Sequence, residues 1–358
     1  MDAQIPLHYD NEKIKGELIA LLKTNLAILM VGSGSSSIVG YPGWKKLVRD
    51  MKNTLYPDLP DPTDDTDLLR YAHTIKDKAI KTQDTEKKYY KFLRETFRHQ
   101  DDGENYHLFH CSLVKLGFSG MVTTNYDHVL ELATQAAYAR PLYCPKCEPI
   151  DLCEGKPYTI FRFLRSLKPD TKHSYILHLH GDYVHPETII LTSNDYLEKY
   201  GLLKDEEEIA IPLDTIHRKV IWALITLHPL VFVGFSLTDK YFLKMIETVQ
   251  SDFELEQKEH NHYAIMGYSN DEDKLKTINE LSRLGICPIF YKIINNFGGA
   301  QDHRGLVDLI FEFENTLTQQ NKVQLQPAEE GESKLSKKTD TGSEDFPKLD
   351  DMNKISGG

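Results

Sequence analysis

The chain has 358 residues, 40% hydrophobic and 27% charged, which allows a sizeable core in one or two domains. The net charge is −12. The segment from Lys322 onward holds eight acidic and six basic residues, so most of the negative charge lies in the part of the chain before it, which we call the body. An acidic body argues against direct nucleic-acid binding, which needs a basic footprint. We expect a cytoplasmic protein: no basic start with an apolar run opens the sequence, no apolar stretch reaches the roughly 20 residues that span a bilayer, and five cysteines fit a reducing compartment.

The first predicted element is an amphipathic helix over residues 11–24, where apolar side chains recur at helical spacing. Residues 26–31 (LAILMV) follow as a continuous apolar run of strand length, which is typical of a parallel strand buried on both faces. A glycine-serine turn over residues 32–37 and a helix from about Gly43 come next. Strand, glycine turn and helix in this order open many nucleotide-binding α/β folds.

The same alternation continues along the chain. Further strands are predicted at residues 120–124, 174–179, 188–192, 230–233, 262–267 and 287–293. Helices are predicted at residues 126–137, 210–228, 237–250, 271–284 and 304–319, and Ser193 is the expected N-cap of a helix after residue 192. Strands that alternate with helices imply an α/β fold with a Rossmann-like, doubly wound, mostly parallel sheet.

The predicted organisation is one folded domain over residues 1–320. Within it, several helices over residues 67–116 break the alternation and indicate a helical insertion at about 56–116. Residues 138–173, with CPKC and several prolines and lysines, are expected to form a second insertion. Residues 321–358 are rich in Glu, Lys, Ser, Asp and Gly, and we expect a disordered tail there.

Four polar loops follow predicted strands, at residues 32–37, 123–127, 178–182 and 233–239. In the first loop, glycines would let backbone N–H groups approach a phosphate, which the following helix favours. Its GxGxxS pattern is neither the full dinucleotide fingerprint nor a Walker A loop, and it also suits a simple tight turn. Because the carboxyl ends of parallel strands meet at one edge of a sheet, the four loops together predict a ligand crevice.

The three later loops carry the candidate reactive groups. In TTNYD, Asn125 offers a donor and an acceptor and Asp127 a carboxylate, although either side chain could instead cap a helix. In HLHGD, His180 can act as a general base near neutral pH, although a lone histidine is often a structural group. In GFSLTD, Gly234 and Ser236 could hold a ribose or phosphate, or form an ordinary turn.

The cysteines do not complete a recognisable metal site. Cys144 and Cys147 form half of a zinc motif, and Cys153 could be a third ligand. Structural zinc normally takes four ligands, and the sequence has no second CxxC pair. The candidates for a fourth ligand include His173, Cys111 and Cys287. We predict that no metal is bound.

The order and wording of the loops resemble the sirtuin family. Its members carry a glycine-serine loop, a Gly-x-Pro segment and Thr-x-Asn-x-Asp, His-Gly and Gly-x-Ser motifs. These appear here at residues 32–35, 40–42, 123–127, 180–181 and 234–236, and the resemblance covers roughly residues 26–295. The wording TTNYD and GFSLTD is similar to that of bacterial sirtuin-like proteins of antiphage defence. Chains of this size resemble the subunit that partners a HerA-type hexameric ATPase.

The resemblance implies an NAD hydrolase that cleaves the nicotinamide–ribose bond and acts in antiphage defence by depleting NAD, under the control of homo-oligomerisation or a HerA-type ATPase. It implies that Asn125 orients the ribose or water and that His180 is the general base. The implied NAD-binding residues are Gly32, Ser33, Gly34, Ser35, Asp127, Gly234 and Ser236. Of these, Asp127 would hold the nicotinamide carboxamide, and Ser236 would touch the adenosine side.

Two features depart from the protein deacylases of this family. Deacylases carry Asp-Phe-Arg after the Gly-x-Pro segment, where this chain has Gly43-Trp44-Lys45. They also carry four zinc cysteines after the catalytic histidine, whereas no cysteine lies between His180 and Gly234. Both departures argue against a groove for a peptide substrate. An NAD-dependent protein deacylase and a non-catalytic NAD or ADP-ribose sensor subunit are the alternatives.

Overall fold

The computed structural model describes residues 9–62, 68–99, 106–138, 147–168, 175–201, 215–235, 237, 239–253, 262–295 and 301–324, without the side chains of 301 and 320–324. The chain divides into two units, Met1–Gln319 and Gln320–Gly358. The tail predicted over residues 321–358 lies outside the described residues, apart from the backbone of the last helix.

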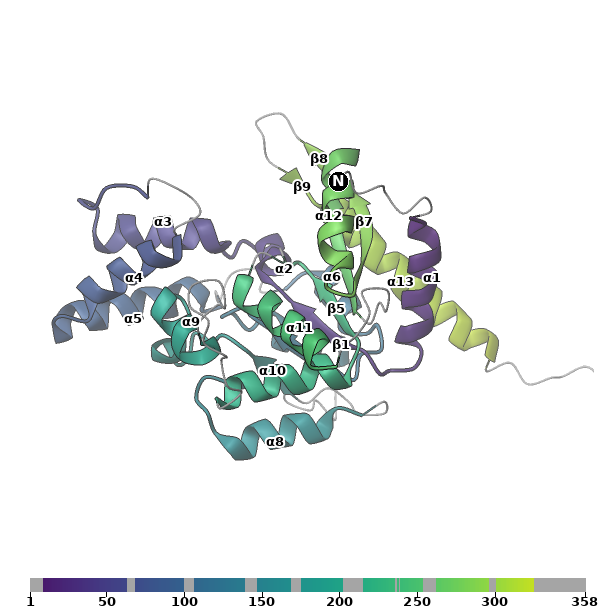
Figure 1. Ribbon diagram of the computed structural model, residues 1–358, viewed down its shortest axis with the longest axis horizontal. Helices are drawn as coiled ribbons and strands as arrows, with labels where there is room; N and C mark the ends of the chain where they lie inside the picture. The colour runs from purple at the N-terminus through teal and green to yellow at the C-terminus, as the bar shows by residue number, and fades with distance from the viewer. Residues whose placement is uncertain are drawn as a thin grey trace, which may run out of the picture. The chain divides into compact units, whose positions relative to one another are not determined.

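A seven-stranded parallel sheet forms the centre of the first unit (Figure 1), with the strand order β3-β4-β2-β1-β5-β6-β7. The strands are β1 (Ile28–Val31), β2 (Gly120–Thr123), β3 (Glu148–Asp151), β4 (Tyr175–His178), β5 (Leu230–Val233), β6 (His262–Tyr268) and β7 (Ile286–Lys292). A separate antiparallel pair joins β8 (Ile294–Asn295) to β9 (Gln301–Asp302). The predicted Rossmann-like parallel sheet is therefore confirmed.

Helices cover both faces of the sheet (Figure 1), because its strands are apolar on both sides. Ile28 and Met30 of β1 belong to one core layer, and Leu29 and Val31 to the other. The first layer is closed by α8 (Pro157–Ser166), α10 (Ile216–Leu227) and α11 (Lys240–Asp252). The second layer is closed by α1 (Asn11–Leu22), α6 (Leu108–Leu113), α7 (Val129–Tyr138) and α13 (Arg304–Gln324). Between β6 and β7 the chain forms another helix, α12 (Asp271–Ser282).

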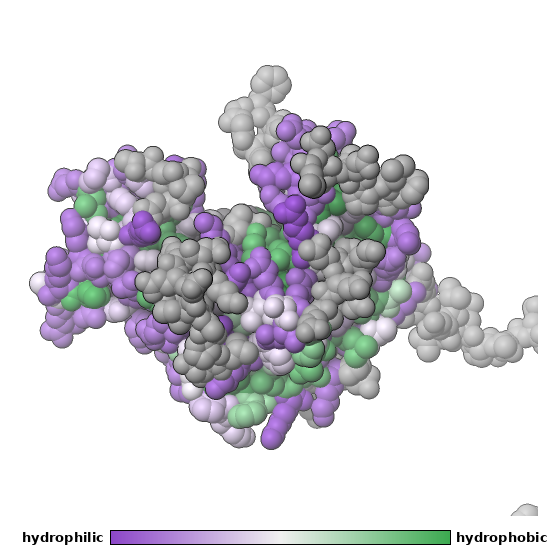
Figure 2. Space-filling view, in the orientation of Figure 1, coloured by the Kyte–Doolittle hydropathy of each residue, from purple (hydrophilic) through white to green (hydrophobic). Residues whose placement is uncertain are grey.

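Three helices form a lobe with a core of its own (left in Figure 1), and we call them the helical lobe: α3 (Trp44–Leu55), α4 (Leu68–Ala79) and α5 (Gln83–Phe97). Their apolar faces meet around side chains such as Val48, Ile75 and Leu93, all of them fully buried. Figure 2 shows that the outer surface of the lobe is mainly hydrophilic in this view. Such amphipathic helices are held by packing one apolar face inward.

Two predictions over the middle of the chain were wrong. Residues 188–192 do not pair as a strand: the 3-10 turn η3 (Pro186–Thr188) is followed by an unpaired extended segment. Ile189 and Leu191 of that segment pack into the core of the lobe, while Ile190 packs against the sheet, so the apolar run connects two cores. The N-cap of α9 (Ser193–Tyr200) is Thr192 and not Ser193, because the Thr192 hydroxyl accepts from the Asp195 N–H in a capping box.

The predicted second insertion, residues 138–173, contains an edge strand of the main sheet. β3 and α8 lie within it and extend the sheet beyond β4, so this stretch continues the strand-helix alternation. In the helical insertion predicted at about 56–116, α4 and α5 belong to the lobe, whereas α6 packs beside α7. Of the helices in the described parts of the chain, none has the length and apolar character that crossing a membrane requires.

Candidate active site

A cavity of about 570 Å³ opens where β1 and β5 end. The chain passes from β1 to β2 on one side and returns to β5 on the other, and ligands bind at such switch points. We call its two sides the sheet wall and the lobe wall. The sheet wall contains Gly32, Ser33, Ser36, Thr124, Asn125, Asp127, His180, Tyr196 and Asp239. The lobe wall contains Tyr41, Pro42, Trp44, Leu47, Leu68, Leu69 and Phe97.

The glycine-serine loop is folded against the β5 loop. The N–H of Gly34 donates to the Gly234 carbonyl at 2.9 Å. Gly234 has a φ of +63°, and a Cβ there would lie 2.4 Å from the Ser35 nitrogen. Glycine is thus required for the close approach of the two backbones. Neither Gly34 nor Gly234 lines the cavity, and their main contact is with each other.

The serines of this loop, part of the short helix α2 (Ser33–Ser36), divide between cavity and interior. Ser33 lies on the sheet wall, whereas Ser35 is buried and its hydroxyl donates to the Gly32 carbonyl at 2.9 Å. Ser36, which sequence analysis did not select, reaches the wall instead. Its hydroxyl accepts from Asn125 Nδ2 at 2.9 Å and lies 3.1 Å from Asp127 Oδ1, to which it donates. Ser36 therefore joins two of the predicted site residues.

Asn125 is held in one orientation. The Thr123 hydroxyl accepts from its backbone N–H at 3.0 Å, and its side-chain Nδ2 donates to the Gly32 carbonyl at 3.2 Å as well as to Ser36. Because a carbonyl only accepts, the amide nitrogen must face Gly32. The other amide atom, Oδ1, is buried and has no hydrogen-bond partner within the described chain. Asn125 thus lines the cavity and carries one buried acceptor that no described residue satisfies.

Asp127 lies on the sheet wall and also performs the capping role considered as its alternative. Its Oδ1 accepts from the Val129 N–H at 3.1 Å, where α7 begins. Burial raises the pKa of the carboxyl, and the hydrogen bonds from Val129 and Ser36 counteract this. Only Oδ1 takes part in these two hydrogen bonds.

His180 lies on the sheet wall and is 4% exposed. Its backbone carbonyl accepts from the Ile190 N–H at 2.9 Å, which fixes the turn after β4. Nε2 lies 2.8 Å from the Tyr200 hydroxyl and 3.8 Å from Asp239 Oδ2. Burial lowers the pKa of His180, although the Asp239 charge opposes the shift. A neutral imidazole in this position can accept a proton, and Asp239 would stabilise the cation that results.

Asp239 and Tyr196 are wall residues that sequence analysis did not select. Asp239 caps α11, accepting from the Tyr241 and Phe242 N–H groups through Oδ1, and its Oδ2 accepts from the Tyr196 hydroxyl at 3.0 Å. Asp239 is the last residue of the GFSLTD motif, so its place after a strand was the available signal. Ser236 of the same motif lies outside the described residues.

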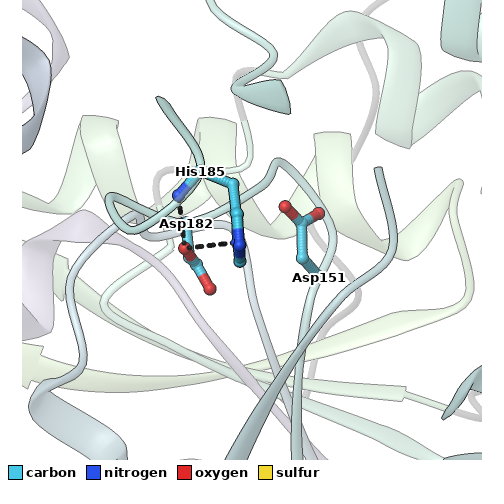
Figure 3. A group of neighbouring side chains, drawn as sticks. All are labelled: Asp151, Asp182 and His185. Atoms are coloured by element: carbon cyan, nitrogen blue, oxygen red, sulfur yellow. Dashed lines mark hydrogen bonds and ion pairs between the residues drawn. The ribbon is translucent and has the colours of Figure 1, made fainter. Parts of the chain in front are cut away.

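A polar cluster of Asp151, Asp182 and His185 lies at the ends of β3 and β4 (Figure 3). Metal-ligating atoms of the three lie within 4.8 Å of one another. The carboxylates are already occupied: Asp151 accepts from two backbone N–H groups and the Thr188 hydroxyl, and Asp182 accepts from the Val184 and His185 N–H groups. These bonds form turns after both strands, and we assign no metal to the cluster.

Of the cysteines considered for zinc, Cys153 adjoins this cluster, because its backbone N–H donates to Asp151 Oδ1 at 2.7 Å. Cys144 lies outside the described residues. Cys147 is buried, and burial raises its pKa, which disfavours the thiolate that zinc requires. The Cys153 thiol donates to the Leu179 carbonyl at 3.3 Å, and burial raises its pKa too. The described thiols behave as packed, protonated side chains.

The fold and the cavity are those of an α/β protein with a ligand crevice at the switch point of its parallel sheet. Residues 119–289 match the SIR2-like domain family. The chain is 26% identical over 285 residues to the protein named NAD(+) hydrolase ThsA of Bacillus cereus strain MSX-D12. This alignment covers 76% of this chain and 51% of that protein. Proteins of the same name from Acinetobacter baumannii strain 532279 and Enterococcus faecium are also 26% identical, over 265 and 250 residues. These alignments cover 72% and 69% of this chain, and 46% and 44% of the two proteins. The chain therefore spans about half the length of the relatives it matches.

Proposed function

We propose that this chain is an NAD glycohydrolase, which cleaves the bond between nicotinamide and ribose with water as the acceptor. The observation that carries the proposal is the Oδ1 atom of Asn125, a buried acceptor without a partner in the described chain, on the same wall as a neutral His180. Relatives named NAD(+) hydrolase support the choice of substrate. The cavity, at about 570 Å³, lies within the range of about 300–1,000 Å³ that is usual for ligand pockets.

The proposed reaction begins when the C1′–N bond breaks and its electron pair leaves with neutral nicotinamide. Positive charge then develops on the ribose, and an enzyme accelerates the step by stabilising that charge. Asn125 Oδ1 is an electronegative atom held in place before the reaction starts. Water attacks C1′, and His180 accepts its proton before releasing it to solvent. The products are ADP-ribose, nicotinamide and one proton.

The binding roles follow from the two walls. Gly32, Ser33 and Ser36 lie where a phosphate or ribose hydroxyl group could be bound. The hydrogen bonds of Asp127 to Ser36 and Val129 both use the carboxylate oxygen Oδ1. The other oxygen, Oδ2, could accept a hydrogen bond from the nicotinamide carboxamide. The apolar lobe wall would contact the flat rings of the substrate. Gly34, Ser35 and Gly234 would contribute to NAD binding by shaping the glycine-serine loop and the loop after β5.

The biological role we propose is antiphage defence by depletion of NAD. The resemblance of the loops TTNYD and GFSLTD to bacterial defence proteins supports this role, as do the relatives named ThsA. An enzyme of this kind must be held inactive until it is needed. We propose that homo-oligomerisation or a HerA-type ATPase provides the control.

The test is release of nicotinamide from NAD by the purified protein without any peptide. We expect wild type to release one nicotinamide for each NAD consumed, and His180→Ala to lose about 10²–10⁴-fold in kcat, the usual contribution of a general base. The control is His73→Ala, a histidine of α4 outside the cavity walls. NAD loss that depends on an acylated peptide would indicate a deacylase. Binding without turnover, even with a HerA-type ATPase added, would indicate a sensor.

A further inference from the structure

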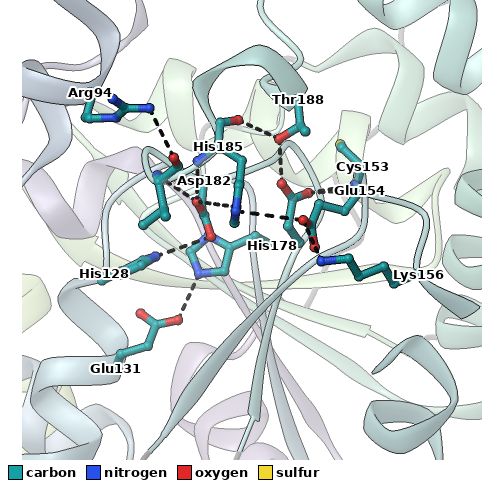
Figure 4. A network of polar contacts seen from close by, with 12 residues as sticks. Arg94, His128, Glu131, Cys153, Glu154, Lys156, His178, Asp182, His185 and Thr188 are labelled. Carbon is teal, nitrogen blue, oxygen red and sulfur yellow. Dashed lines mark hydrogen bonds and ion pairs between the residues drawn. The ribbon is translucent and has the colours of Figure 1, made fainter. Parts of the chain in front are cut away.

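A second histidine of the HLHGD segment contacts Asn125 from behind the sheet wall. His178, the last residue of β4, is fully buried and does not line the cavity. Its Nδ1 lies 2.9 Å from the backbone carbonyl oxygen of Asn125. On the other side of the ring, its Nε2 lies 2.8 Å from Glu131 Oε1 (Figure 4). Glu131 is in the first turn of α7 and is 3% exposed. The three residues form one buried chain of hydrogen bonds.

The partners of the His178 ring determine where its protons are. The Asn125 carbonyl can only accept, so Nδ1 must carry a hydrogen. The contact between Nε2 and the Glu131 carboxyl group then requires a second proton. A ring that donates on both sides is an imidazolium, and the carboxylate of Glu131 balances its charge. Without that carboxylate, the neutral ring has two tautomers, of which one places a bare nitrogen against the Asn125 carbonyl.

We propose that Glu131 and His178 are positioning residues for Asn125. Glu131 fixes the protons of His178, and His178 in turn holds the main chain of Asn125 so that its amide oxygen stays aimed at the reacting ribose. This inference rests on the proposed NAD glycohydrolase activity. The pair acts through Asn125 and does not touch substrate.

The position of Asn125 in the chain explains why its main chain needs the hydrogen bond from His178. The residue lies between β2 and α7, outside regular secondary structure. Its N–H is bound through Thr123 and its Nδ2 through Gly32 and Ser36, so His178 supplies the hydrogen bond to its carbonyl. A shift of about 1 Å in a catalytic group can cost on the order of 10²-fold in rate. The pair therefore affects turnover more than substrate binding.

The charges around His178 favour the doubly protonated ring. Burial opposes the charge, but the charge of Glu131 and its hydrogen bond outweigh burial and raise the pKa of His178 to about 9. The titratable groups that face the ring come from α7, the loop before it, β3 and the turn after β4: Glu131, Asp127, His128, Asp151 and Asp182. Most of them are carboxyl groups, and the nearby His128 ring lies 3.5 Å from Asp182 Oδ2.

The test compares wild type with Glu131→Gln, which keeps the shape of the side chain and removes its charge. ¹⁵N NMR of the imidazole nitrogens should show His178 protonated on both nitrogens up to about pH 9 in wild type, and singly protonated at pH 7.5 in Glu131→Gln. We expect kcat to fall about 10-fold in the variant with KM unchanged. In wild type, kcat should also fall as the pH rises through about 9 and His178 loses its second proton, and this alkaline fall should be absent in the variant. The control is Glu148→Gln, an exposed glutamate of β3.

The outcomes separate this inference from the proposed function. A neutral His178 in wild type at pH 7.5 overturns the inference whatever the activity. If wild type releases nicotinamide and a folded Glu131→Gln matches its kcat from pH 6 to 10, the positioning role is wrong and the glycohydrolase stands. If wild type does not turn over NAD, even with a HerA-type ATPase added, although the ring is doubly protonated, the proposed function fails, and with it the catalytic purpose of the pair. Melting temperature and circular dichroism establish that the variant is folded.

Discussion

The two walls of the cavity differ in how their side chains are held. On the sheet wall, Ser36, Asn125 and Asp127 are fixed by hydrogen bonds to one another and to the backbone. On the lobe wall, Trp44 and Phe97 belong to a separate apolar cluster and are held by packing. Directional bonds fix individual atoms, whereas packing fixes a shape. We therefore propose that the sheet wall performs the chemistry and that the lobe wall determines the fit of the substrate.

Of the changes that compare the two walls, the largest effect is expected at Asn125 of the sheet wall. Asn125→Ala removes the unpartnered Oδ1 and should lower kcat by about 10²–10³-fold, the usual cost of losing one preorganised electrostatic group. KM should change little, because the charge on the ribose develops only in the transition state. Steady-state kinetics of nicotinamide release measure both. Asn53→Ala, at an exposed asparagine of α3, serves as the control, and an equal rise in KM would place Asn125 in ground-state binding.

The next effect concerns the lobe wall. Trp44 is partly buried and lines the cavity, so Trp44→Ala should keep the fold and raise KM about 10-fold, with kcat within about 2-fold of wild type. The physical reason is the loss of apolar contact area that ground state and transition state share. A fall in kcat equal to that of Asn125→Ala would show that the two walls do not divide binding from chemistry. Trp222→Ala, at the other tryptophan of the chain, is the matched control.

Acid should weaken the sheet before the lobe. Burial lowers the pKa of His110 and of His262 from 6.5 to about 4 in the folded state, so the unfolded chain binds more protons between these values. Stability then falls as the pH drops below 6.5, by up to about 1.4 kcal/mol per pH unit for each group. Within the described parts of α3, α4 and α5 no histidine is buried. Hydrogen exchange at pH 7.5 and 5 should show faster opening of β6 and α6 than of the lobe helices.

At alkaline pH, His178 should make the protein less stable as the pH rises, which is the opposite of the trend caused by His110 and His262. Its folded pKa of about 9 exceeds the unfolded value of 6.5, so the stability that it contributes is complete below 6.5 and is lost as the pH rises through 9. Melting temperature should therefore decline between pH 7 and 9.5 in wild type. Glu131→Gln should be less stable at pH 7 and show a weaker decline. Parallel curves for the two proteins would contradict the paired arrangement.

The smallest expected effect is the flat response of the sheet wall to mild acid. Because burial lowers the pKa of His180, the acidic limb of kcat/KM should lie below the usual histidine value of about 6.5. Activity should therefore change less than about 2-fold between pH 7.5 and 6.5. A half-maximal rate at pH 6.5 would mean that His180 titrates like a solvent-exposed histidine and that the site is open to water.

Much of the sheet was predictable, because continuous apolar runs such as residues 28–31 and 230–233 are buried on both faces. The edge strand β3 was missed, since its sequence EPID begins with a charge and a proline, and an edge strand needs little apolar surface. Residues 188–192 have the composition of a strand but connect two cores. Local sequence does not distinguish these two uses of an apolar segment.

The candidate site was predictable in its parts and not in its contacts. Asn125, Asp127 and His180 lie on one wall because their loops follow neighbouring parallel strands. Ser36 lines the cavity in place of the predicted Ser35, because the short helix α2 turns Ser35 inward and Ser36 toward Asn125. Tyr196 lies on α9 and reaches Asp239 across 43 residues of sequence, so no local pattern could pair them.

The walls of the cavity are drawn from segments spread between Gly32 and Tyr241. During synthesis, a ribosome must therefore release about two thirds of the chain before the last wall residues can join the first. A nascent or truncated chain that ends before Asp239 lacks part of the sheet wall and cannot complete the site. Under the proposed function, such an incomplete copy of the protein would therefore not consume NAD.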